Sequence, residues 1–300
     1  MLKLDGIASF VAVAEGGSIS EAARRQRLSK SVVSERLAEL ERALGATLLR
    51  RTTRKLAFTE HGSAFLARAR RILREVEDAT ADVAEGRGEL TGPLRISAPV
   101  TFGRMHLGPA LYPFLQRYPD IALTLDLDDR RVDAAADGYD AVVRHGAIED
   151  SRLVAWKLAA SRRHLVASPA YLERCGTPAS AADLAGHRGI FYANRGVGDW
   201  RFRDRDGVVV LRGRVGLLVN NGDVMRDAAL AGVGLAMLPT FIVGEALRTG
   251  ALIALDLGFE PENEFLYIAH PEGRRPSAKL KAFADCLRAA FGDPPYWEPA

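Results

Sequence analysis

The clearest pattern in the chain is a helical hydrophobic stripe between residues 29 and 45. Apolar residues recur there at intervals of four, three and four, which places them on one side of an α-helix. The stripe consists of Val33, Leu37, Leu40 and Leu44. Ser29 stands at the N-cap position, and Gly45 is the residue type that best accepts a left-handed turn after a helix. The sequence therefore predicts a helix that ends near Leu44 and buries one face.

Two further helices are predicted upstream. Ser18 is followed three residues later by Glu21, the spacing of a capping box, so a helix begins there and runs through Arg25. A first helix over about residues 4–15 has its own apolar face, which consists of Ile7, Phe10, Val11 and Ala14. The second and third helices are close enough in sequence to be joined by a tight turn.

The outward face of the third helix is rich in small and hydrogen-bonding side chains. At about 100° per residue it carries Ser31, Glu35, Ala38 and Arg42, with Lys30 and Ser34 beside them near the N-terminus. A helix that enters a DNA major groove needs such a surface, because bulky side chains would hold it away from the base edges. The alternative is an ordinary helical hairpin with a polar face, and this helix alone leaves both interpretations open.

The segment over residues 48–55 is basic and favours extended backbone. It contains no acid and four cations, which are Arg50, Arg51, Arg54 and Lys55. Thr52 and Thr53 favour a strand, so we expect a hairpin that turns back through residue 55 into residues 56–59. A short basic hairpin beside a groove-sized helix can neutralise DNA phosphates. The helix and the hairpin together favour DNA binding.

At this point the sequence resembles the LysR-type transcriptional regulators. Their winged helix-turn-helix reads A-A-R-R-L-x-L-S-x-S-A-V-S, then L-E-x-x-L-G-x-x-L-x-R-R-T-T-R and L-T-x-x-G. The matching segments here are Ala22–Arg25, Leu28–Ser34, Leu40–Glu41, Leu44–Gly45, Leu48–Arg54 and Thr59–Gly62. The resemblance implies that double-stranded promoter DNA is the partner of this region.

The resemblance also suggests roles for individual residues. We expect the bases to be contacted by Lys30, Ser31, Ser34 and Glu35. We expect the phosphates to be held by Arg36, Arg50, Arg51, Thr52, Arg54 and Lys55, with Ser29 and Thr53 completing the DNA-binding set. Glu35 departs from the basic or amide residues often found at its position. An acid can accept a hydrogen bond from cytosine N4 but repels phosphates, so the role of Glu35 stays open.

A single long helix is predicted from Glu60 to Glu85. No proline occurs there and Gly62 is its only glycine; at 1.5 Å per residue such a helix spans roughly 40 Å. Its apolar residues form a heptad seam of Phe65, Ala69, Ile72, Val76, Ala79 and Val83. We expect this seam to pair with a second copy of the chain, which would set two DNA-binding heads at a fixed separation over a quasi-palindromic site. Packing on its own domain is the alternative.

Beyond a Gly-rich hinge at residues 86–88 and at Gly92-Pro93, strand-like and helix-like segments alternate. The expected strands are Leu94–Ser97, Ile121–Leu127, Ala141–Arg144 and Leu165–Ser168. The expected helices are Gly103–Arg117, Pro169–Arg174, Gly222–Ala231, Phe241–Leu247 and Ser277–Phe291. This alternation predicts open α/β sheets with helices on both faces, and too many strands for one sheet.

This part is similar to the effector-binding domain of the LysR family, which has a two-lobed, periplasmic-binding-protein-like fold. The similar segments are 92–97, 139–144, 165–172, 227–239 and 277–283. The overall expectation is an α+β multidomain protein with a winged helix-turn-helix over 1–59, a linker and dimerisation helix over 60–88, and an effector-binding domain over 89–300. By resemblance, the first lobe covers about 92–163 and 267–291, and the second about 164–266.

Ligands of open α/β sheets bind beyond the carboxyl ends of the strands. One candidate loop follows the first strand and offers hydroxyls, an aromatic wall at Phe102 and backbone N–H groups at a helix start; its residues are Ser97, Pro99, Val100, Thr101 and Phe102. Its counterpart in the second lobe is Asn220, Asn221 and Gly222, and another strand ends in Arg144 and His145. The alternative is that the serine and the asparagines only cap helices and turns. Asp223 would repel an anionic ligand.

Composition narrows the class of protein. Hydrophobic residues make up 48% and charged residues 26%, as in a globular soluble protein. Residues 1–88 hold 16 Lys and Arg against 12 Asp and Glu, so the positive excess lies in the segment proposed to meet DNA. Cys175 and Cys286 form no C-x-x-C, and we expect two buried, reduced thiols. Trp200, with Arg201, Arg203 and Arg205, is expected on a solvated strand or loop.

No signal peptide or membrane span is predicted, so we expect a cytoplasmic protein without a membrane partner. We predict neither a metal nor a cofactor, because the histidines lack metal-ligand spacing and no nucleotide-binding or catalytic motif occurs. The sequence favours a regulator that binds an inverted-repeat promoter site as a homodimer or homotetramer and responds to a small-molecule effector, with RNA polymerase as a further candidate partner. The alternative is a two-lobed metabolite-binding protein or enzyme with an accessory DNA-binding head.

Overall fold

The computed structural model describes residues 2–51, 56–85, 89–130, 132–148, 150–196, 200–203, 208–261, 264–272 and 276–298. The chain divides into two compact units, residues 1–92 with 135–138, and residues 93–134 with 139–300. The predicted hairpin tip at Thr52–Lys55, the predicted hinge at Gly86–Gly88, and Arg205 lie outside the described residues.

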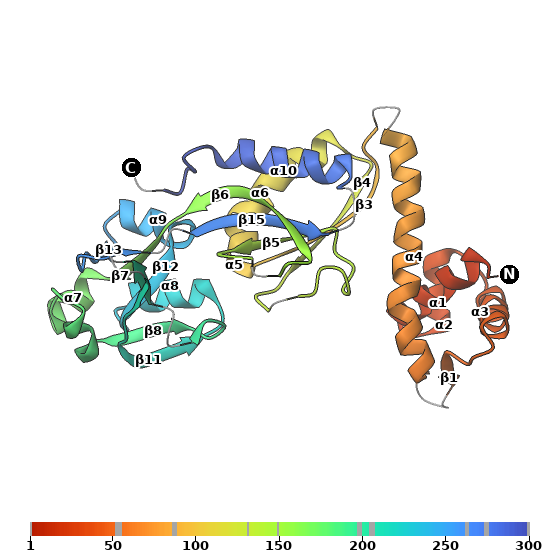
Figure 1. Ribbon diagram of the computed structural model, residues 1–300, viewed down its shortest axis with the longest axis horizontal. Helices are drawn as coiled ribbons and strands as arrows, with labels where there is room; N and C mark the ends of the chain where they lie inside the picture. Colours follow the sequence, from red (N-terminus) through yellow and green to blue (C-terminus); the bar gives the residue numbers. More distant parts are fainter. Residues whose placement is uncertain are drawn as a thin grey trace. The chain divides into compact units, whose positions relative to one another are not determined.

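The first unit consists of three short helices, a hairpin and a long helix (Figure 1). In chain order these are α1 (Leu4–Gly16), α2 (Ile19–Gln26), α3 (Lys30–Leu44), β1 (Leu49–Arg51), β2 (Leu56–Phe58) and α4 (Glu60–Glu85). The predicted caps are confirmed, since the backbone N–H of Glu21 donates to Ser18 Oγ at 3.1 Å and Gly45 adopts a φ of 65°. Strands β1 and β2 pair antiparallel, with Arg50 opposite Ala57.

The apolar stripe of α3 forms the centre of this unit's core. Val33, Leu37 and Leu40 are buried and pack against α1 and α2. The α1 side chains in the same cluster include Phe10, which is fully buried. Burial of these side chains contributes roughly 1.5–3 kcal/mol each, so the three helices hold one another in place and present the opposite side of α3 to solvent.

The apolar seam of α4 is buried in the first half of the helix and exposed in the second half. Its first half packs on its own unit: Ala69 is fully buried, and Phe65 lies against the core with a ring centroid 5.6 Å from that of Phe10. Its second half is exposed, to 40% at Ile72, 41% at Val76 and 64% at Val83. The prediction of a seam reserved for a second copy is therefore wrong for the first half of the helix.

The second unit contains two five-stranded sheets, each the centre of one lobe. The first-lobe sheet has the order β4 (Ile121–Leu127), β3 (Gly92–Ala98), β5 (Ala141–His145), β15 (Glu264–Pro271) and β6 (Leu153–Ser161). The second-lobe sheet has the order β11 (Arg214–Val219), β8 (Arg188–Tyr192), β12 (Leu235–Pro239), β7 (Arg163–Ala167) and β13 (Ile253–Ala254). A three-stranded sheet is formed by β10 (Val208–Val210), β9 (Arg201–Arg203) and β14 (Glu260–Pro261).

Both large sheets are mixed, because strands far apart in sequence pair antiparallel at the middle of each sheet. In the first lobe β15 pairs antiparallel with both β5 and β6, while β3 and β5 are parallel. In the second lobe β7 pairs antiparallel with β12, while β8 is parallel to β11 and β12. The chain crosses to the second lobe between β6 and β7 and returns before β15, so these strands link the two lobes (Figure 1).

The helices largely match the predicted segments. They are α5 (Val100–Phe102), a π-helical turn (Gly103–Leu107), α6 (Gly108–Arg117), α7 (Pro169–Cys175), a 3₁₀ turn (Ala182–Gly186), α8 (Gly222–Leu230), α9 (Thr240–Arg248) and α10 (Ala278–Phe291). The first of them begins at Val100 and not at the predicted Gly103, because Pro99 stands at its N-cap with extended backbone. The helix start therefore lies directly beyond the end of β3.

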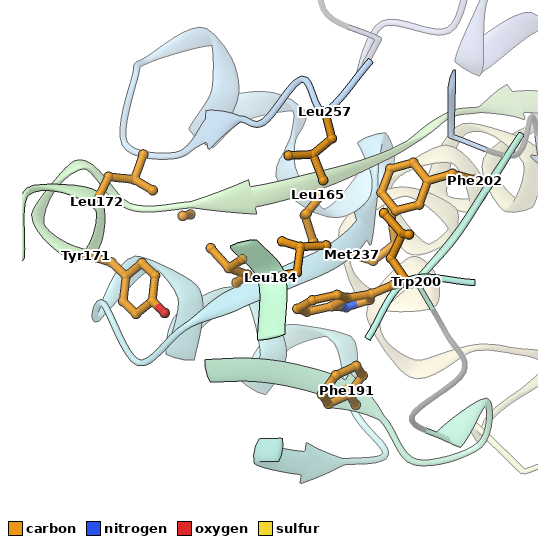
Figure 2. Close-up of a cluster of buried hydrophobic side chains, with 12 residues drawn as sticks. Leu165, Tyr171, Leu172, Leu184, Phe191, Trp200, Phe202, Met237 and Leu257 are labelled. Atoms are coloured by element: carbon orange, nitrogen blue, oxygen red, sulfur yellow. The ribbon is translucent and has the colours of Figure 1, made fainter. Parts of the chain in front are cut away.

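Trp200 corrects one prediction. It is fully buried in the second-lobe core, where its indole lies near Leu165, Met237 and Phe202 (Figure 2). The ring also stacks on Phe191 at 4.8 Å. The neighbouring arginines suggested a solvated strand, but strand alternation places them on the opposite face from the core. Arg201 and Arg203 are exposed. The two cysteines were also predicted wrongly, since Cys175 is exposed and Cys286 is only partly buried.

Candidate functional site

The outward face of α3 is open to solvent. Lys30, Ser31 and Glu35 are exposed, and Ser34 is half-buried beside them. Exposure of these side chains follows from the burial of the opposite stripe, since one helix can bury only one face against α1 and α2. The face keeps the small side chains that access to a major groove requires.

Two of the predicted DNA contacts have structural partners within the first unit. Ser29 caps α3, because its Oγ accepts from the Val32 N–H at 3.3 Å, and it lies 2.7 Å from Ser31 Oγ. Arg36 forms an ion pair with Asp5 at 3.0 Å, which ties α3 to the start of α1. The predicted N-cap role of Ser29 is therefore confirmed, and the guanidinium of Arg36 contributes to helix packing.

The hairpin is attached to α3 by a half-buried acceptor, Glu41, which the sequence analysis named only as part of the family motif. Glu41 Oε1 accepts from the backbone N–H groups of Leu48 and Leu49 at 2.7 and 3.1 Å. Arg50 is exposed on β1, and Arg51 ends that strand. Thr52, Thr53, Arg54 and Lys55 lie outside the described residues. Glu41 thus fixes where the basic hairpin leaves the helix.

The Thr59 and Gly62 pair explains the L-T-x-x-G motif in physical terms. Thr59 Oγ1 donates to Thr47 O at 2.6 Å and accepts from the Gly62 N–H at 2.9 Å, so it closes the hairpin and begins α4. A Cβ on Gly62 would collide with the carbonyl oxygen of Leu48. Only glycine allows the long helix to approach the hairpin this closely.

In the second unit, the predicted loops of the two lobes touch each other directly. Thr101 Oγ1 donates to Asp223 Oδ2 and accepts from the Asp223 N–H, both at 3.1 Å. A Cβ on Gly222 would lie 2.7 Å from Ile242 Cδ1 and 3.1 Å from Thr101 Oγ1, so a larger residue there would displace these side chains. We call this contact region, from Val100, Thr101 and Asp129 to Asn221 and Asp223, the lobe junction.

A carboxylate of the chain itself already occupies the predicted anion position at the helix start. Asp129 Oδ1 accepts from the Val100 N–H at 3.0 Å. Burial raises the pKa of the Asp129 carboxyl, although hydrogen bonds from Val100 and from the Asn221 side chain act against that rise. Asn194 of the second lobe donates to the Asp129 carbonyl oxygen at 2.8 Å. Asp129 therefore links the two lobes.

Asp223 is not the bare negative charge that the sequence suggested. Arg104 donates to its Oδ1, and Arg226 lies 3.3 Å from the same oxygen. Burial would raise the pKa of Asp223, but the hydrogen bonds from Arg104 and Thr101 outweigh burial and lower it. The expected repulsion of an anionic ligand is thus largely compensated inside the protein.

Several predicted effector contacts lie in other surroundings. Phe102 is fully buried and packs edge-on against Phe241 at 5.3 Å, so the expectation of an aromatic wall for a ligand is wrong. Ser97 is fully buried, and its Oγ has no hydrogen-bond partner among the residues that the structure describes. Asn221 Oδ1 accepts from the Val224 N–H at 3.1 Å and caps α8, whereas Asn220 is exposed.

Among the predicted effector contacts, Arg144 is a cation whose described hydrogen bonds go to backbone carbonyl groups. Its side chain donates to the Val143 carbonyl oxygen at 3.0 Å, and it has no ion pair with any described residue. Burial lowers its pKa, against the attraction of Asp128, Tyr192 and Asp129. Tyr192 lies at the end of β8, and burial, followed by the Asp129 charge, raises its pKa to about 12.

His145 belongs to a buried ion cluster where the chain crosses between the lobes. Its Nδ1 lies 3.0 Å from Glu264 Oε2, and Arg195 Nη1 lies 2.7 Å from Glu264 Oε1. Burial lowers the pKa of His145 to about 4, against the attraction of Glu264. Burial also opposes ionisation of Glu264, but His145, Arg163 and Arg195 outweigh it and lower its pKa to about 2. This cluster connects β5 and β15 of the first lobe to the second lobe.

Sequence reasoning missed Asp129, Asn194, Glu264 and the arginines that neutralise Asp223. A usable signal existed for Asp129, which follows a predicted strand in the polar run 128–131. No local pattern marks Glu264 or Arg195, because their partners are distant in sequence.

Within the described ranges, no three His, Cys, Asp or Glu side chains are grouped so that they could hold a metal ion. None of the helices in the described part of the chain combines the length and the hydrophobicity needed to cross a membrane.

Comparison with known proteins places both units. Residues 4–63 match the bacterial regulatory helix-turn-helix proteins of the lysR family, and residues 87–292 match the LysR substrate binding domain. The HTH-type transcriptional regulator PtxR of Pseudomonas aeruginosa is 35% identical over 298 residues, covering 98% of this chain and 95% of that protein.

Solved full-length structures of LysR-type regulators have a similar fold. The LysR-type regulator CrgA of Neisseria meningitidis superposes with a TM-score of 0.61 at 30% identity, covering 95% of this chain and 97% of CrgA. The virulence activator AphB of Vibrio cholerae gives a TM-score of 0.58 at 26% identity, with 96% and 99% covered. These relatives are transcriptional regulators and not enzymes, which decides against an enzyme with an accessory DNA-binding head. The chain belongs to the LysR-type transcriptional regulators and combines a DNA-binding helix-turn-helix with an effector-binding domain.

Proposed function

We propose that this regulator binds an inverted-repeat promoter site as a homodimer or homotetramer and changes that binding in response to a small-molecule effector. The observation that carries the proposal is the exposed polar face of α3, next to a hairpin whose described strand holds exposed Arg50. A groove-entering helix and a cationic hairpin supply base contacts and phosphate contacts respectively.

The division of roles follows the exposure of the side chains. We assign base contacts to Lys30, Ser31, Ser34 and Glu35. We assign phosphate contacts to Arg50 and, from the sequence alone, to Arg51, Thr52, Thr53, Arg54 and Lys55. Ser29 and Arg36 act by positioning α3, since one caps it and the other pairs with Asp5.

Pairing of two copies is supported by the second half of α4. Its exposed apolar residues Ile72, Val76 and Val83 share one side of the helix with Arg71, Glu75, Ala79 and Thr80. We expect Val76→Asp to shift the protein to single subunits in analytical ultracentrifugation. Ala67→Asp is the matched control, because the exposed Ala67 lies nine residues earlier and, at about 100° per residue, on the opposite side of the helix. Equal dissociation by both variants would argue against this interface.

For the effector we propose the surroundings of the lobe junction, with Arg144 as the residue most able to bind a polar or anionic group. The hydrogen bonds of its guanidinium to backbone carbonyl groups, with no ion pair to a described residue, and its position at the end of β5 support this role. The loops of the two lobes would also change on effector binding. Their residues are Pro99, Val100, Thr101, Asn220, Asn221 and Gly222. RNA polymerase remains a further candidate partner of the DNA-bound form.

Gel shifts on a panel of inverted repeats that differ in half-site spacing test the proposal. We expect one spacing to be preferred, because two heads on a fixed stalk read half-sites about one helical turn apart or a multiple of it. Binding that is independent of spacing would contradict an oligomer with fixed heads. A metabolite thermal-shift screen, followed by a turnover assay on each hit, tests the effector, since a sensor binds its ligand without consuming it.

A further inference from the structure

The segment after α10 folds back over the place where the two lobes meet. It follows Phe291 and lies beyond residue 292, where the match to the substrate binding domain ends. Trp297 is only 4% exposed, and the carboxylate side chain of Glu298 is equally buried. We call residues 292–298 the strap.

The strap binds the first lobe through two aromatic residues. Trp297 Nε1 donates to the Ala160 carbonyl oxygen in β6 at 3.3 Å, and its ring packs against Phe291 and Phe102. Tyr296 Oη lies 2.6 Å from His106 Nδ1. His106 Nε2 lies 2.7 Å from the Phe241 carbonyl oxygen, which can only accept, so Nε2 carries the proton. In the neutral ring, which burial favours by lowering the pKa of His106, Nδ1 is then the acceptor for the tyrosine hydroxyl.

The same strap binds the second lobe and the crossing between the lobes. Glu298 Oε1 accepts from Thr240 Oγ1 at 2.6 Å and from the Arg162 backbone N–H at 3.1 Å. Thr240 begins α9 of the second lobe, and Arg162 lies between β6 and β7. On the next turn of α9, a Cβ on Gly244 would collide with the Trp297 carbonyl oxygen. This glycine is therefore required for the strap to lie flat on α9.

We propose that the strap is a brace that holds the two lobes at a fixed angle. Without it, the lobes are joined by the crossings before β7 and before β15, by the lobe junction, by the Glu264–Arg195 ion pair and by the contacts of Phe102 and His106 with Phe241. Rotation of the second lobe would pull Thr240 and Gly244 away from residues anchored on Ala160 and His106. It would also leave the buried Glu298 carboxylate without its donors, and an unpaired buried charge is costly.

The brace gives the effector domain a preferred angle between its two lobes. Given the proposed effector response, a ligand that changes the lobe angle must act against the strap, and its effect is limited by its differential affinity for the two angles. The angle between the lobes can be measured without any ligand. A result that contradicts the brace would therefore not contradict the proposed effector response, and the absence of an effector response would not contradict the brace.

Spin-label distances in the full-length protein test the brace. One label is placed on the exposed Cys175 in α7 of the second lobe, and the other on Gln116→Cys in α6 of the first lobe, in a Cys286→Ser background. We expect Trp297→Ala and Glu298→Ala to broaden the distance distribution and shift its mean. An unchanged distribution in these variants would overturn the proposal.

A glycine pair separates the brace from a general loss of structure. Gly244→Ala displaces the strap without altering any strap residue, so it should broaden the distribution in the same way. Gly186→Ala, in the same lobe, is the matched control, because no atom lies within 4 Å of its Cβ position and its distances should stay as in the parent. If Gly244→Ala behaves like Gly186→Ala, the strap does not set the angle.

Discussion

The polar face of α3 and the polar cluster at the lobe crossing have similar residue types but opposite surroundings. On α3, Lys30, Ser31 and Glu35 face solvent, and the helix needs none of them for its own packing. At the crossing, His145 and Glu264 are largely buried, and the partly exposed Arg195 neutralises Glu264. Charged side chains can therefore serve DNA recognition where they are exposed and stabilise the fold where they are buried.

This contrast teaches that polar residues predict a binding site only where the fold leaves them unsatisfied. The predicted ligand loops at the lobe junction are largely satisfied by the chain's own groups, with Asp129 on the Val100 N–H and Asp223 on Thr101. A ligand there must compete with those contacts. A base or phosphate at α3 competes mainly with water.

Glu264→Gln should give the largest effect. The amide keeps the shape of the side chain but removes the negative charge that offsets Arg163 and Arg195, and breaking a buried ion pair costs about 3–5 kcal/mol. Chemical denaturation followed by tryptophan fluorescence measures this loss in the second unit, because all three tryptophans lie there, at positions 156, 200 and 297.

Glu245→Gln is the control for this loss. Glu245 pairs with Arg248 on an exposed surface of the second lobe, in the same compact unit as Glu264, with both side chains more than 60% exposed. Exposed pairs contribute about 0–1 kcal/mol, so its midpoint should hardly move. Equal losses in the two variants would show that the buried cluster does not stabilise the crossing.

Acidification should weaken the second unit through His145. The pKa of His145 in the folded protein is about 4, below the ordinary value of 6.5. Between these pH values, His145 is protonated in the unfolded chain but not in the folded protein. The stabilisation is complete above pH 6.5 and is lost as the pH falls toward 4, on the order of 1–3 kcal/mol. Denaturation midpoints across this range should fall less steeply in His145→Asn than in the parent.

Ser31→Ala should change DNA recognition without changing stability. The side chain is exposed and its one described hydrogen bond is to Ser29, so the unfolding free energy should stay within about 0.5 kcal/mol. Sequence preference at one operator position should change by about 1–3 kcal/mol if the hydroxyl contacts a base edge. Competition gel shifts with single-base variants measure the preference. A uniform loss over all sequences would instead identify Ser31 as a backbone contact.

Arg50→Gln should have the smallest effect on specificity. The loss of one phosphate contact weakens binding to every sequence equally and reduces the slope of log K against log salt by about 1. Arg248→Gln, which removes an exposed arginine of the second unit, should leave the slope unchanged. A change in sequence preference with a constant slope would mean that Arg50 contacts bases.

The helix α4 illustrates how far a sequence pattern reaches. The heptad spacing correctly indicates a long helix with one apolar stripe, because that spacing is a property of the helix itself. It does not distinguish Ala69, which is buried in its own unit, from Val83, which is exposed. Ala69 belongs to the part of α4 that packs in the core with α1, and no pattern within α4 marks where that packing stops.

The effector domain shows the same limit at longer range. Loop positions at strand ends were found from the sequence, yet Phe102 is core and Ser97 is enclosed. Trp200 was misplaced because its exposed arginine neighbours dominate the local pattern, while its partners Phe191 and Met237 come from other strands. Asp129, Glu264 and the strap have partners that are between 29 and 190 residues away in sequence.

The sequence by itself determined what nearby residues decide among themselves: the caps at Ser18 and Ser29, the stop at Gly45, the apolar face of α3 and the basic hairpin that follows it. These depend on hydrogen bonds and spacings within a few residues, which the order of amino acids specifies directly. Only the tertiary structure decided which charges are paired at the lobe crossing, how the strap joins the lobes and which half of α4 is left uncovered. Those outcomes depend on burial, and burial is a property of the assembled fold.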